Sequence, residues 1–299
     1  MRALVTGASG FVAGWLIRHL RDSGDAVVGI DESIDIGDGD ALRRAVTDAA
    51  PEAIYHLAAF THVGRSWEQP REVFRVNAVG TLELLQAALA CDRPPRVLLV
   101  GSAEVYGGVK PDALPVGEDA PLLPVSPYAA SKVAAEYLGV QAHLGHGLPV
   151  VRVRAFNHIG PGQHASFVVP ALTRRILEAK AGGERTLRVG NLSARRDFTD
   201  VRDVVRAYRL LVEKGAAGEA YNVCSGRAVS IEEIAHRLLE LADADLELVV
   251  DPELVRPVDV PVLLGDRARI GAATGWEPEI DLDRTLRDVV ADERSALTG

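Results

Sequence analysis

Short apolar runs alternate with longer stretches of helical spacing through the first half of the chain. Apolar runs bounded by glycine or polar residues predict strands at 3–6, 26–30, 53–57, 96–100 and 150–154. The stretches between them, such as 15–21 and 74–89, are predicted helices. The run at 96–100 is almost wholly apolar, as expected for a parallel strand that is covered on both faces. The alternation therefore predicts an α/β fold with a doubly wound parallel sheet.

The pattern changes after about residue 160. Helical stretches are predicted at 167–181, 201–214, 230–241 and 283–294. We expect residues 1–160 to form a ligand-binding domain around the parallel sheet, and 161–299 to form mainly a smaller mixed α/β lobe. Part of 197–225 is expected to return to the first domain, because Tyr221-Asn222-Val223 has the character of a strand that could complete the sheet.

Composition narrows the class of protein. The 299 residues are 47% hydrophobic and 25% charged, as is usual for a soluble globular protein. The net charge of -9 argues against a nucleic-acid-binding surface. Cys91 and Cys224 are too few for a disulfide framework, and no spacing of side chains suggests a metal site. We predict no signal peptide and no membrane span, and hence a cytoplasmic protein without a nucleic-acid or membrane partner.

A glycine pattern follows the strand at 3–6. The sequence Gly7-Ala8-Ser9-Gly10 leads directly into a predicted helix, and this context favours a dinucleotide site over a plain strand-to-helix turn. Gly7 would allow the tight turn, Gly10 would let the backbone approach a pyrophosphate, and the helix N-terminus would face its charge. Ala13 takes the place of a third glycine, and it is small enough to keep the helix close to the sheet. The first domain is therefore predicted to be of the Rossmann type.

Acidic and small residues follow the second and third strands. Asp31 would accept hydrogen bonds from the adenosine ribose and repel a 2′-phosphate, and no basic residue follows until Arg43, which favours NAD(H) over NADP(H). Asp35 and Ile36 lie where the chain would pass an adenine, although Asp35 equally fits an ordinary loop acid. The stretch His56-Leu57-Ala58-Ala59 fits either close approach to a flat ligand or tight helix packing.

Tyr128 and Lys132 are four residues apart, after a proline that suits the first turn of a helix. Both would project from one helical face, where the ammonium would lower the pKa of the tyrosine and make its hydroxyl a usable proton donor. Taken alone, the pair is as expected for a half-buried tyrosine and a solvated lysine. Ser102 and Glu104, however, follow the strand at 96–100, at the sheet edge where open α/β folds bind ligands.

In this order, the motifs resemble the extended short-chain dehydrogenase/reductase superfamily, in its nucleotide-sugar epimerase, dehydratase and reductase group. They are Thr6-Gly7-x-x-Gly10, Asp35-Ile36, His56-Leu57-Ala58-Ala59, Ser102, Tyr128-x-x-x-Lys132 and the turn at Asn157. The resemblance covers essentially the whole chain. Three further stretches, 156–163, 189–203 and 221–226, resemble the GDP-4-dehydro-6-deoxy-mannose reductase branch of the group.

The resemblance implies an oxidoreductase that reduces the C4 ketone of a GDP-4-keto-6-deoxyhexose of the mannose type with NAD(P)H. It implies a catalytic set of Ser102, Tyr128, Lys132 and Glu104. The implied cofactor-binding residues are Gly7, Ser9, Gly10, Phe11, Val12, Asp31, Asp35, Ile36, Leu57, Ala58, Ala59, Asn77, Tyr128, Lys132 and Phe156. The implied substrate-binding residues are Ser102, Glu104, Asn157, Val168, Arg196 and Arg256. A nucleotide-diphosphate sugar is the expected substrate, and a homodimer is the expected assembly.

Two rival activities stay open. Glu104 stands where related 4,6-dehydratases keep their base, although similar reductases keep a glutamate there too, so a lyase with tightly bound NAD⁺ is an alternative. A 4-epimerase is the other. A regulatory relative that senses NAD(H) without turnover is disfavoured by the intact Ser102, Tyr128 and Lys132.

Four further residues have two readings each. Asn77 fits a proton relay or a packing amide, and His158 fits a cofactor contact or a structural role. Arg174 better fits a solvated helix face than a diphosphate contact, and Asp203 better fits a helix cap than a ligand contact.

Overall fold

A single parallel sheet forms the centre of the first domain in the computed structural model, which describes residues 1–254 and 260–298. Its strands lie in the order β2-β1-β3-β4-β5-β9. They are β1 (Arg2–Thr6), β2 (Ala26–Ile30), β3 (Ala53–His56), β4 (Arg96–Val100), β5 (Val150–Ala155) and β9 (Ala220–Val223). The chain winds outward from β1 in both directions, so β1 and β3 flank the switch point where such sheets bind ligands. This order confirms the predicted doubly wound fold.

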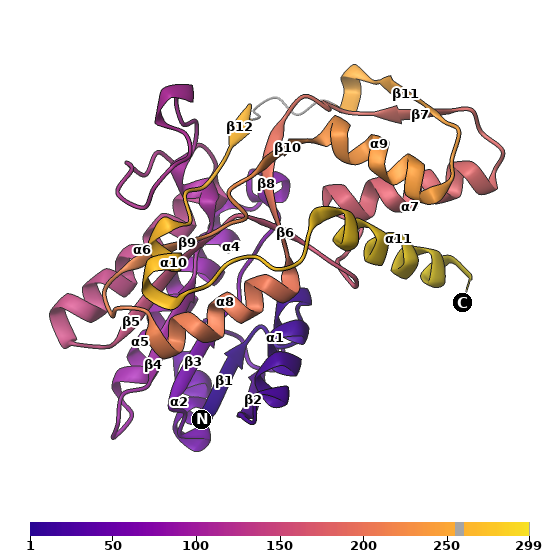
Figure 1. The fold of residues 1–299 in the computed structure, drawn as a ribbon. Helices are drawn as coiled ribbons and strands as arrows, with labels where there is room; N and C mark the ends of the chain where they lie inside the picture. The colour runs from indigo at the N-terminus through magenta and orange to yellow at the C-terminus, as the bar shows by residue number, and fades with distance from the viewer. Residues whose placement is uncertain (255–259, 299) are drawn as a thin grey trace.

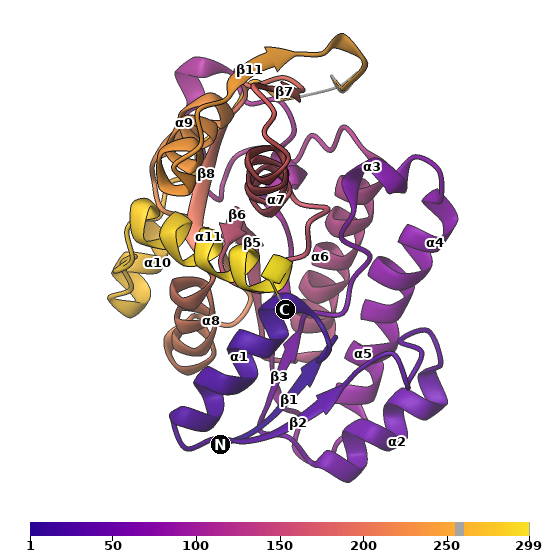
Figure 2. The ribbon, with the colours of Figure 1, turned by 90° about the vertical axis from the view of Figure 1, so that its right-hand side faces the viewer.

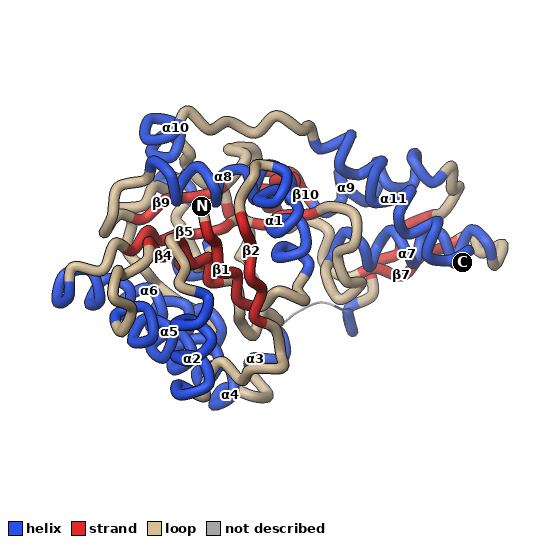
Figure 3. Tube along the Cα trace, turned by 90° about the horizontal axis from the view of Figure 1, so that it is seen from below, coloured by secondary structure: helices blue, strands red, loops and turns tan. Residues whose placement is uncertain are grey.

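Helices cover both faces of the sheet, and this is why its strands are apolar (Figures 2 and 3). On one face lie α1 (Phe11–Asp22) and α8 (Val201–Lys214), and on the other lie α2 (Gly39–Ala49), α5 (Gly80–Leu89) and α6 (Pro127–His146). The shorter helices are α3 (Val63–Ser66), α4 (Pro70–Phe74), α10 (Ala268–Thr274) and the 3₁₀ turns Ala103–Tyr106, Pro111–Ala113 and Pro252–Leu254.

The helix predicted at 74–89 is wrong in one respect, because the structure divides it. Pro70–Phe74 forms α4, Arg75–Val79 forms a π-helical turn, and α5 begins at Gly80. The Thr81 hydroxyl donates to the Asn77 carbonyl over 2.6 Å, and such bonds from a side chain to the preceding turn distort a helix. Amphipathic spacing alone does not reveal that distortion.

Three helices surround the core of the C-terminal lobe, at the upper right of Figure 1: α7 (Val168–Ala181), α9 (Ile231–Ala242) and α11 (Leu282–Thr298). A small parallel sheet of β7 (Thr186–Val189) and β11 (Glu247–Val250) lies beside them. A second sheet joins this lobe to the first domain and contains β6 (Asn157–Ile159), β8 (Arg195–Asp200), β10 (Ala228–Ser230) and β12 (Val262–Leu263). Over the residues described, no helix is both long and apolar enough to cross a membrane.

Buried aspartates at every third position, Asp197, Asp200 and Asp203, fasten the two parts together. The Asp197 carboxylate accepts hydrogen bonds from the amides of Ser225, Gly226 and Gly265 over 2.7, 2.9 and 3.4 Å. Burial raises the pKa of Asp197 above its ordinary value, and the hydrogen bonds from these donors offset only part of that rise. The first aspartate thus holds the loop after β9 to β8.

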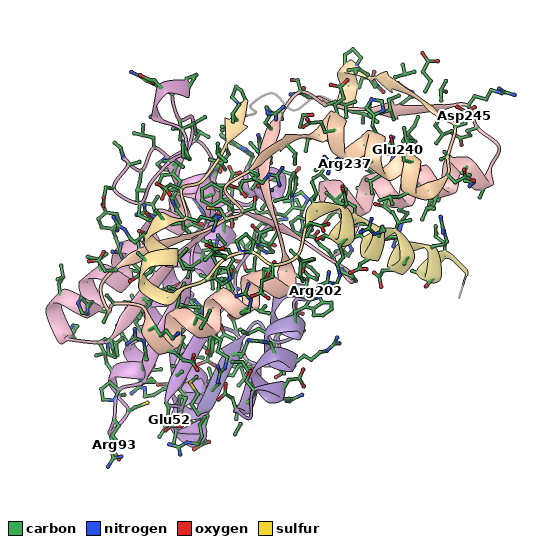
Figure 4. All side chains as sticks on the ribbon, viewed as in Figure 1. Glu52, Arg93, Arg202, Arg237, Glu240 and Asp245 are labelled. Carbon is green, nitrogen blue, oxygen red and sulfur yellow. The ribbon has the colours of Figure 1, made fainter. Side chains whose placement is uncertain are left out.

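The other two aspartates bind the C-terminal segment. Asp200 caps α8 by accepting from the Arg202 amide over 2.8 Å, and it also accepts from the Thr285 hydroxyl over 2.7 Å. Arg202, labelled in Figure 4 where α8 meets the C-terminal lobe, reaches Asp288 of α11 over 2.7 Å. Asp203 is therefore not the cap. Its carboxylate instead accepts from the amides of 279 and 280, both over 2.9 Å.

Candidate active site

The glycine turn after β1 lies against the chain that leaves β3. Gly7 has φ +69°, and a Cβ placed on it would lie 2.9 Å from the Cα and N of Ala58. Only glycine fits both the backbone conformation and the space. Gly10 precedes α1, and no side chain caps that helix end. Its first-turn amides are therefore directed at the switch point, and the turn fits the pyrophosphate of a dinucleotide.

Asp31 and Asp35 follow β2, where the sequence predicts the adenosine of the cofactor. The hydroxyl and amide of Ser33 hydrogen-bond to the exposed Asp31 carboxylate and lower its pKa. Asp35 accepts from the Arg75 guanidinium and from the Gly37 amide, each over 2.8 Å. Asp31 is thus an available acceptor, whereas Asp35 takes part in an ion pair that orders its own loop.

Five apolar residues predicted to contact the cofactor follow the first three strands: Phe11, Val12, Ile36, Leu57 and Ala59. Ile36 is buried against Gly80, because a Cβ on that glycine would lie 2.7 Å from the Ile36 Cγ2. Phe11 and Val12 form the first turn of α1, and Ser9 precedes it. The predicted cofactor residues up to Ala59 therefore follow β1, β2 and β3, which are neighbouring strands of the sheet.

Tyr128, Lys132 and Ser102 come together at the carboxyl end of β4. Ser126 caps α6 by accepting from the Ala129 amide over 3.1 Å, which places Tyr128 in the first turn. The Tyr128 hydroxyl lies close enough to the Ser102 side chain for Ser102 to lower the pKa of Tyr128. The Lys132 ammonium donates to the Val100 carbonyl over 2.9 Å. Both Tyr128 and Lys132 are 7% exposed, so the half-buried tyrosine and solvated lysine are excluded.

Burial controls the charges of this pair. It raises the pKa of Tyr128 to about 12, while Ser102 lowers that pKa and the nearby Glu104 raises it. Burial also lowers the pKa of Lys132 to about 8. The predicted lowering of the Tyr128 pKa by Lys132 is therefore wrong for this structure, because the ammonium is held by Val100 and desolvation of the phenol dominates. Tyr128 stays protonated near neutral pH and suits a proton donor.

Asn77 joins the π-helical turn to α6. Its side-chain oxygen accepts from the Phe60 amide over 2.7 Å, and its nitrogen donates to the Phe60 carbonyl and to the Ser131 hydroxyl over 3.1 and 2.8 Å. The side chain is 2% exposed. These contacts are those of a packing amide, and one of them reaches Ser131, which lies in α6 between Tyr128 and Lys132.

The predicted substrate residues come from the joining sheet and the start of α7. Asn157 lies in β6 opposite Phe198 of β8, and Val168 is the first residue of α7 with 37% of its surface exposed. Arg196 donates to the Val260 carbonyl over 2.6 Å, so its guanidinium is held next to the segment that leads into β12. Arg256 lies outside the described residues.

Phe156 and His158 flank Asn157. Phe156 is buried and its ring lies 6.4 Å from that of Tyr106, so it packs within the first domain. His158 donates from Nδ1 to the Phe156 carbonyl over 3.0 Å, which is a structural contact. Arg174 makes an ion pair over 2.9 Å with Glu293, which is 4% exposed, and so it anchors α11 rather than facing solvent alone.

A buried ion cluster below the catalytic pair was missed by the sequence reasoning. Glu136 accepts from Arg152 and Arg154 over 2.9 and 2.7 Å, and Arg154 also donates to the Tyr106 hydroxyl over 2.9 Å. The cluster fixes α6 against β5 and against the turn that carries Glu104. Its signal was available, because Glu136 continues the four-residue spacing of Tyr128 and Lys132.

Known proteins match this chain over nearly its whole length. The GDP-mannose 4,6 dehydratase family matches residues 32–289. GDP-6-deoxy-D-mannose reductase of Pseudomonas aeruginosa is 39% identical over 297 residues, covering 98% of this chain and 97% of that protein. GDP-mannose 4,6-dehydratase of Vibrio cholerae is 27% identical over 348 residues, covering 97% and 93%.

Solved structures agree. That of RMD from Pseudomonas aeruginosa with NADPH has a TM-score of 0.92 and 38% identity, covering 99% of this chain and 100% of that one. UDP-glucose 4-epimerase of Thermotoga maritima with UDP-glucose has a TM-score of 0.90 and 28% identity, with the same coverage. The fold, the Ser102–Tyr128–Lys132 geometry and these matches place the chain in the GDP-mannose 4,6-dehydratase family, among the NAD(P)-dependent nucleotide-sugar enzymes of the extended short-chain dehydrogenase/reductase type.

Proposed function

We propose that this protein reduces the C4 ketone of a GDP-4-keto-6-deoxyhexose of the mannose type. The observation that carries the proposal is the buried position of Tyr128 and Lys132, one helical turn apart in α6 at the carboxyl end of β4, with Ser102 close enough to Tyr128 to lower its pKa. The 39% identity to a reductase of a GDP-linked deoxymannose supports the substrate class.

The residues divide the chemistry between them. A bound reduced nicotinamide supplies the hydride. Tyr128 donates its proton to O4 as negative charge develops there, and Ser102 donates a second hydrogen bond to the same oxygen. Ketone, hydride and proton together give the alcohol. Lys132 holds the cofactor ribose, because its ammonium can donate hydrogen bonds to the ribose hydroxyls.

A 4,6-dehydratase is the second candidate, because one observation favours it. Glu104 lies close enough to Tyr128 to raise its pKa, and a carboxylate beside the tyrosine is what proton abstraction from the sugar needs. The match to dehydratases points the same way. An epimerase, the third reading, is supported by the likeness to UDP-glucose 4-epimerase.

One assay separates these activities. Absorbance at 340 nm follows NADH or NADPH with GDP-4-keto-6-deoxymannose, and a parallel incubation with GDP-mannose is analysed for a keto product. Loss of one reduced cofactor per keto sugar is the expected result. A keto sugar formed from GDP-mannose without added cofactor would contradict the reductase and establish the dehydratase.

The same assay tests the choice of cofactor, for which we propose NADH over NADPH. Asp31 presents an exposed carboxylate at the end of β2, and it would repel a 2′-phosphate. Arg43 pairs with Asp40, and Arg75 pairs with Asp35. The relative solved with NADPH argues for the opposite preference. A higher kcat/KM with NADPH would therefore refute this role of Asp31.

We also propose a homodimer. Large apolar side chains are exposed on adjacent helices of the first domain: Phe74, Val79, Tyr137 and Leu144 are 40, 43, 59 and 77% exposed. Such a patch is usual for a subunit interface. Light scattering during size-exclusion chromatography should give twice the chain mass for the wild type and the mass of one chain for Leu144→Glu. A wild-type monomer would refute the assembly.

A further inference from the structure

A buried histidine joins three elements behind the active site. Thr6 Oγ1 at the end of β1 lies 2.8 Å from Nδ1 of His56, and Thr81 Oγ1 on α5 lies 3.0 Å from Nε2. His56 itself ends β3 and is 4% exposed. Both ring nitrogens are therefore bound by hydroxyl groups, each of which can donate or accept.

The partners at the two ends determine the direction of every bond. A carbonyl only accepts, so the Thr81 proton goes to the Asn77 carbonyl, 2.6 Å away, and the Thr81 oxygen accepts from His56 Nε2. In a neutral imidazole Nε2 then carries the only proton, and Nδ1 accepts from the Thr6 hydroxyl, which itself accepts from the Ala58 amide over 3.1 Å. The hydrogen bonds thus assign the proton of the neutral ring to Nε2.

A second set of hydrogen bonds leads from the Asn77 side chain into the catalytic helix. Asn77 Nδ2 donates to Ser131 Oγ over 2.8 Å, and Ser131 donates to the Tyr128 carbonyl over 2.7 Å. Hydrogen bonds that run in one direction polarise and strengthen one another in a buried site. The two sets of bonds therefore connect Thr6, at the start of the cofactor turn, with the first turn of α6, through the π-helical turn that holds Asn77.

The surroundings keep His56 uncharged. His56, Thr81, Lys132, Glu136 and Arg152 line one small cavity beneath α6. Burial and the charge of Lys132 lower the pKa of His56 to about 3. A protonated imidazole would also donate from Nδ1, so the Thr6 hydroxyl would have to turn and accept from both His56 and the Ala58 amide.

We propose that His56 is a positioning residue, which as a neutral Nε2–H imidazole holds the π-helical turn at Asn77 against the cofactor turn. It thereby sets Tyr128 and Lys132 relative to the nicotinamide. The inference rests on the proposed ketone reduction for its catalytic part, but its structural part concerns cofactor binding as well.

The tautomer is tested first, by ¹⁵N NMR of the imidazole nitrogens in protein labelled at histidine. His56→Gln identifies the resonance by its loss. An Nε2–H signal that does not titrate between pH 5.5 and 9 is expected. A proton on Nδ1, or titration in that range, would overturn the proposed hydrogen-bond direction.

Kinetics then test the positioning. His56→Phe removes both hydrogen bonds, and its kcat with saturating cofactor and keto sugar should fall on the order of 10- to 100-fold, as expected for a displaced catalytic group. Its cofactor affinity should fall too. His56→Gln keeps a donor and an acceptor and should restore most of the rate. Thr81→Val should lower kcat in the same direction.

Thr173→Val is the matched control. Thr173 is also buried and donates to the carbonyl four residues earlier, over 2.9 Å, but it lies in α7 and away from His56. Wild-type kcat in folded Thr81→Val, or an equal loss in Thr173→Val, would overturn the proposal. If His56→Phe does not fold, the kcat of Thr81→Val decides whether the proposal holds. If the wild type leaves the keto sugar unchanged, the proposed function fails, whereas cofactor affinity and the tautomer still decide the role of His56.

Discussion

Replacing Lys132 by methionine should stabilise the folded protein while abolishing turnover. The ammonium is 7% exposed, and burial lowers its pKa from 10.5 to about 8. Each pKa unit is worth about 1.4 kcal/mol, so the charged lysine costs the native state about 3 kcal/mol at pH 7. Loss of its hydrogen bond to Val100 offsets about 1 kcal/mol. We therefore expect the free energy of unfolding to rise by about 2 kcal/mol in Lys132→Met.

The sign of the pH dependence distinguishes this cause from general repacking. The pKa of Lys132 is lower in the folded protein, so between about pH 8 and 10.5 the unfolded chain binds more protons and wild-type stability gains from this group as pH rises. The advantage of Lys132→Met should thus fall from about 2 kcal/mol at pH 7 to near zero at pH 9.5.

Urea unfolding of the cofactor-free proteins, followed by circular dichroism at both pH values, measures these differences. Lys110→Met is the control, because Lys110 is exposed and its replacement should change stability by less than about 0.5 kcal/mol at either pH. A Lys132→Met protein that is less stable than wild type at pH 7, or an advantage that does not change with pH, would refute the reasoning.

Three further substitutions test the site and its support. Tyr128→Phe removes the proton donor and should lower kcat by about 100- to 10,000-fold, while cofactor affinity measured by fluorescence stays at the wild-type level. Gly7→Ala places a Cβ 2.9 Å from the Ala58 backbone at φ +69°, so cofactor affinity should fall and unfolding should cost about 1–2 kcal/mol less. Asp203→Ala leaves two part-buried amides and Arg206 without the buried carboxylate that they bind, and it should destabilise by about 3 kcal/mol in urea, against less than about 0.5 kcal/mol for exposed Asp245→Ala. A wild-type kcat in Tyr128→Phe, a wild-type cofactor affinity in Gly7→Ala or a wild-type stability in Asp203→Ala would contradict the corresponding prediction.

Local sequence patterns predict the fold well where a single physical factor determines the local structure. Continuous apolar strands and a glycine turn at Gly7 follow from burial on both faces and from a required positive φ, and both can be recognised in sequence. The helix at 201–214 has the predicted bounds, because its apolar stripe and its Asp200 cap coincide. The π-helical turn at 75–79 could not be predicted, since it depends on a hydroxyl bond to Asn77 and on Ser131 in a distant helix.

Charges were harder to predict than positions. The sequence placed Tyr128 and Lys132 together, but the pKa of each depends on how much water reaches it, and that is a property of the assembled fold. Asp203 was misjudged for a similar reason: its partners at 279 and 280 lie more than seventy residues away. No spacing in the sequence indicates such a contact.

Transfer of a labelled hydride tests the central claim most directly. The enzyme is incubated with GDP-4-keto-6-deoxymannose and NADH or NADPH that carries deuterium at C4 of the nicotinamide on the transferring face. The account predicts one deuterium at C4 of the sugar for each cofactor oxidised, seen by NMR and mass spectrometry, and its loss in Tyr128→Phe. A sugar product without deuterium at C4, or conversion with no cofactor oxidised, would contradict the assignment as a C4 ketoreductase.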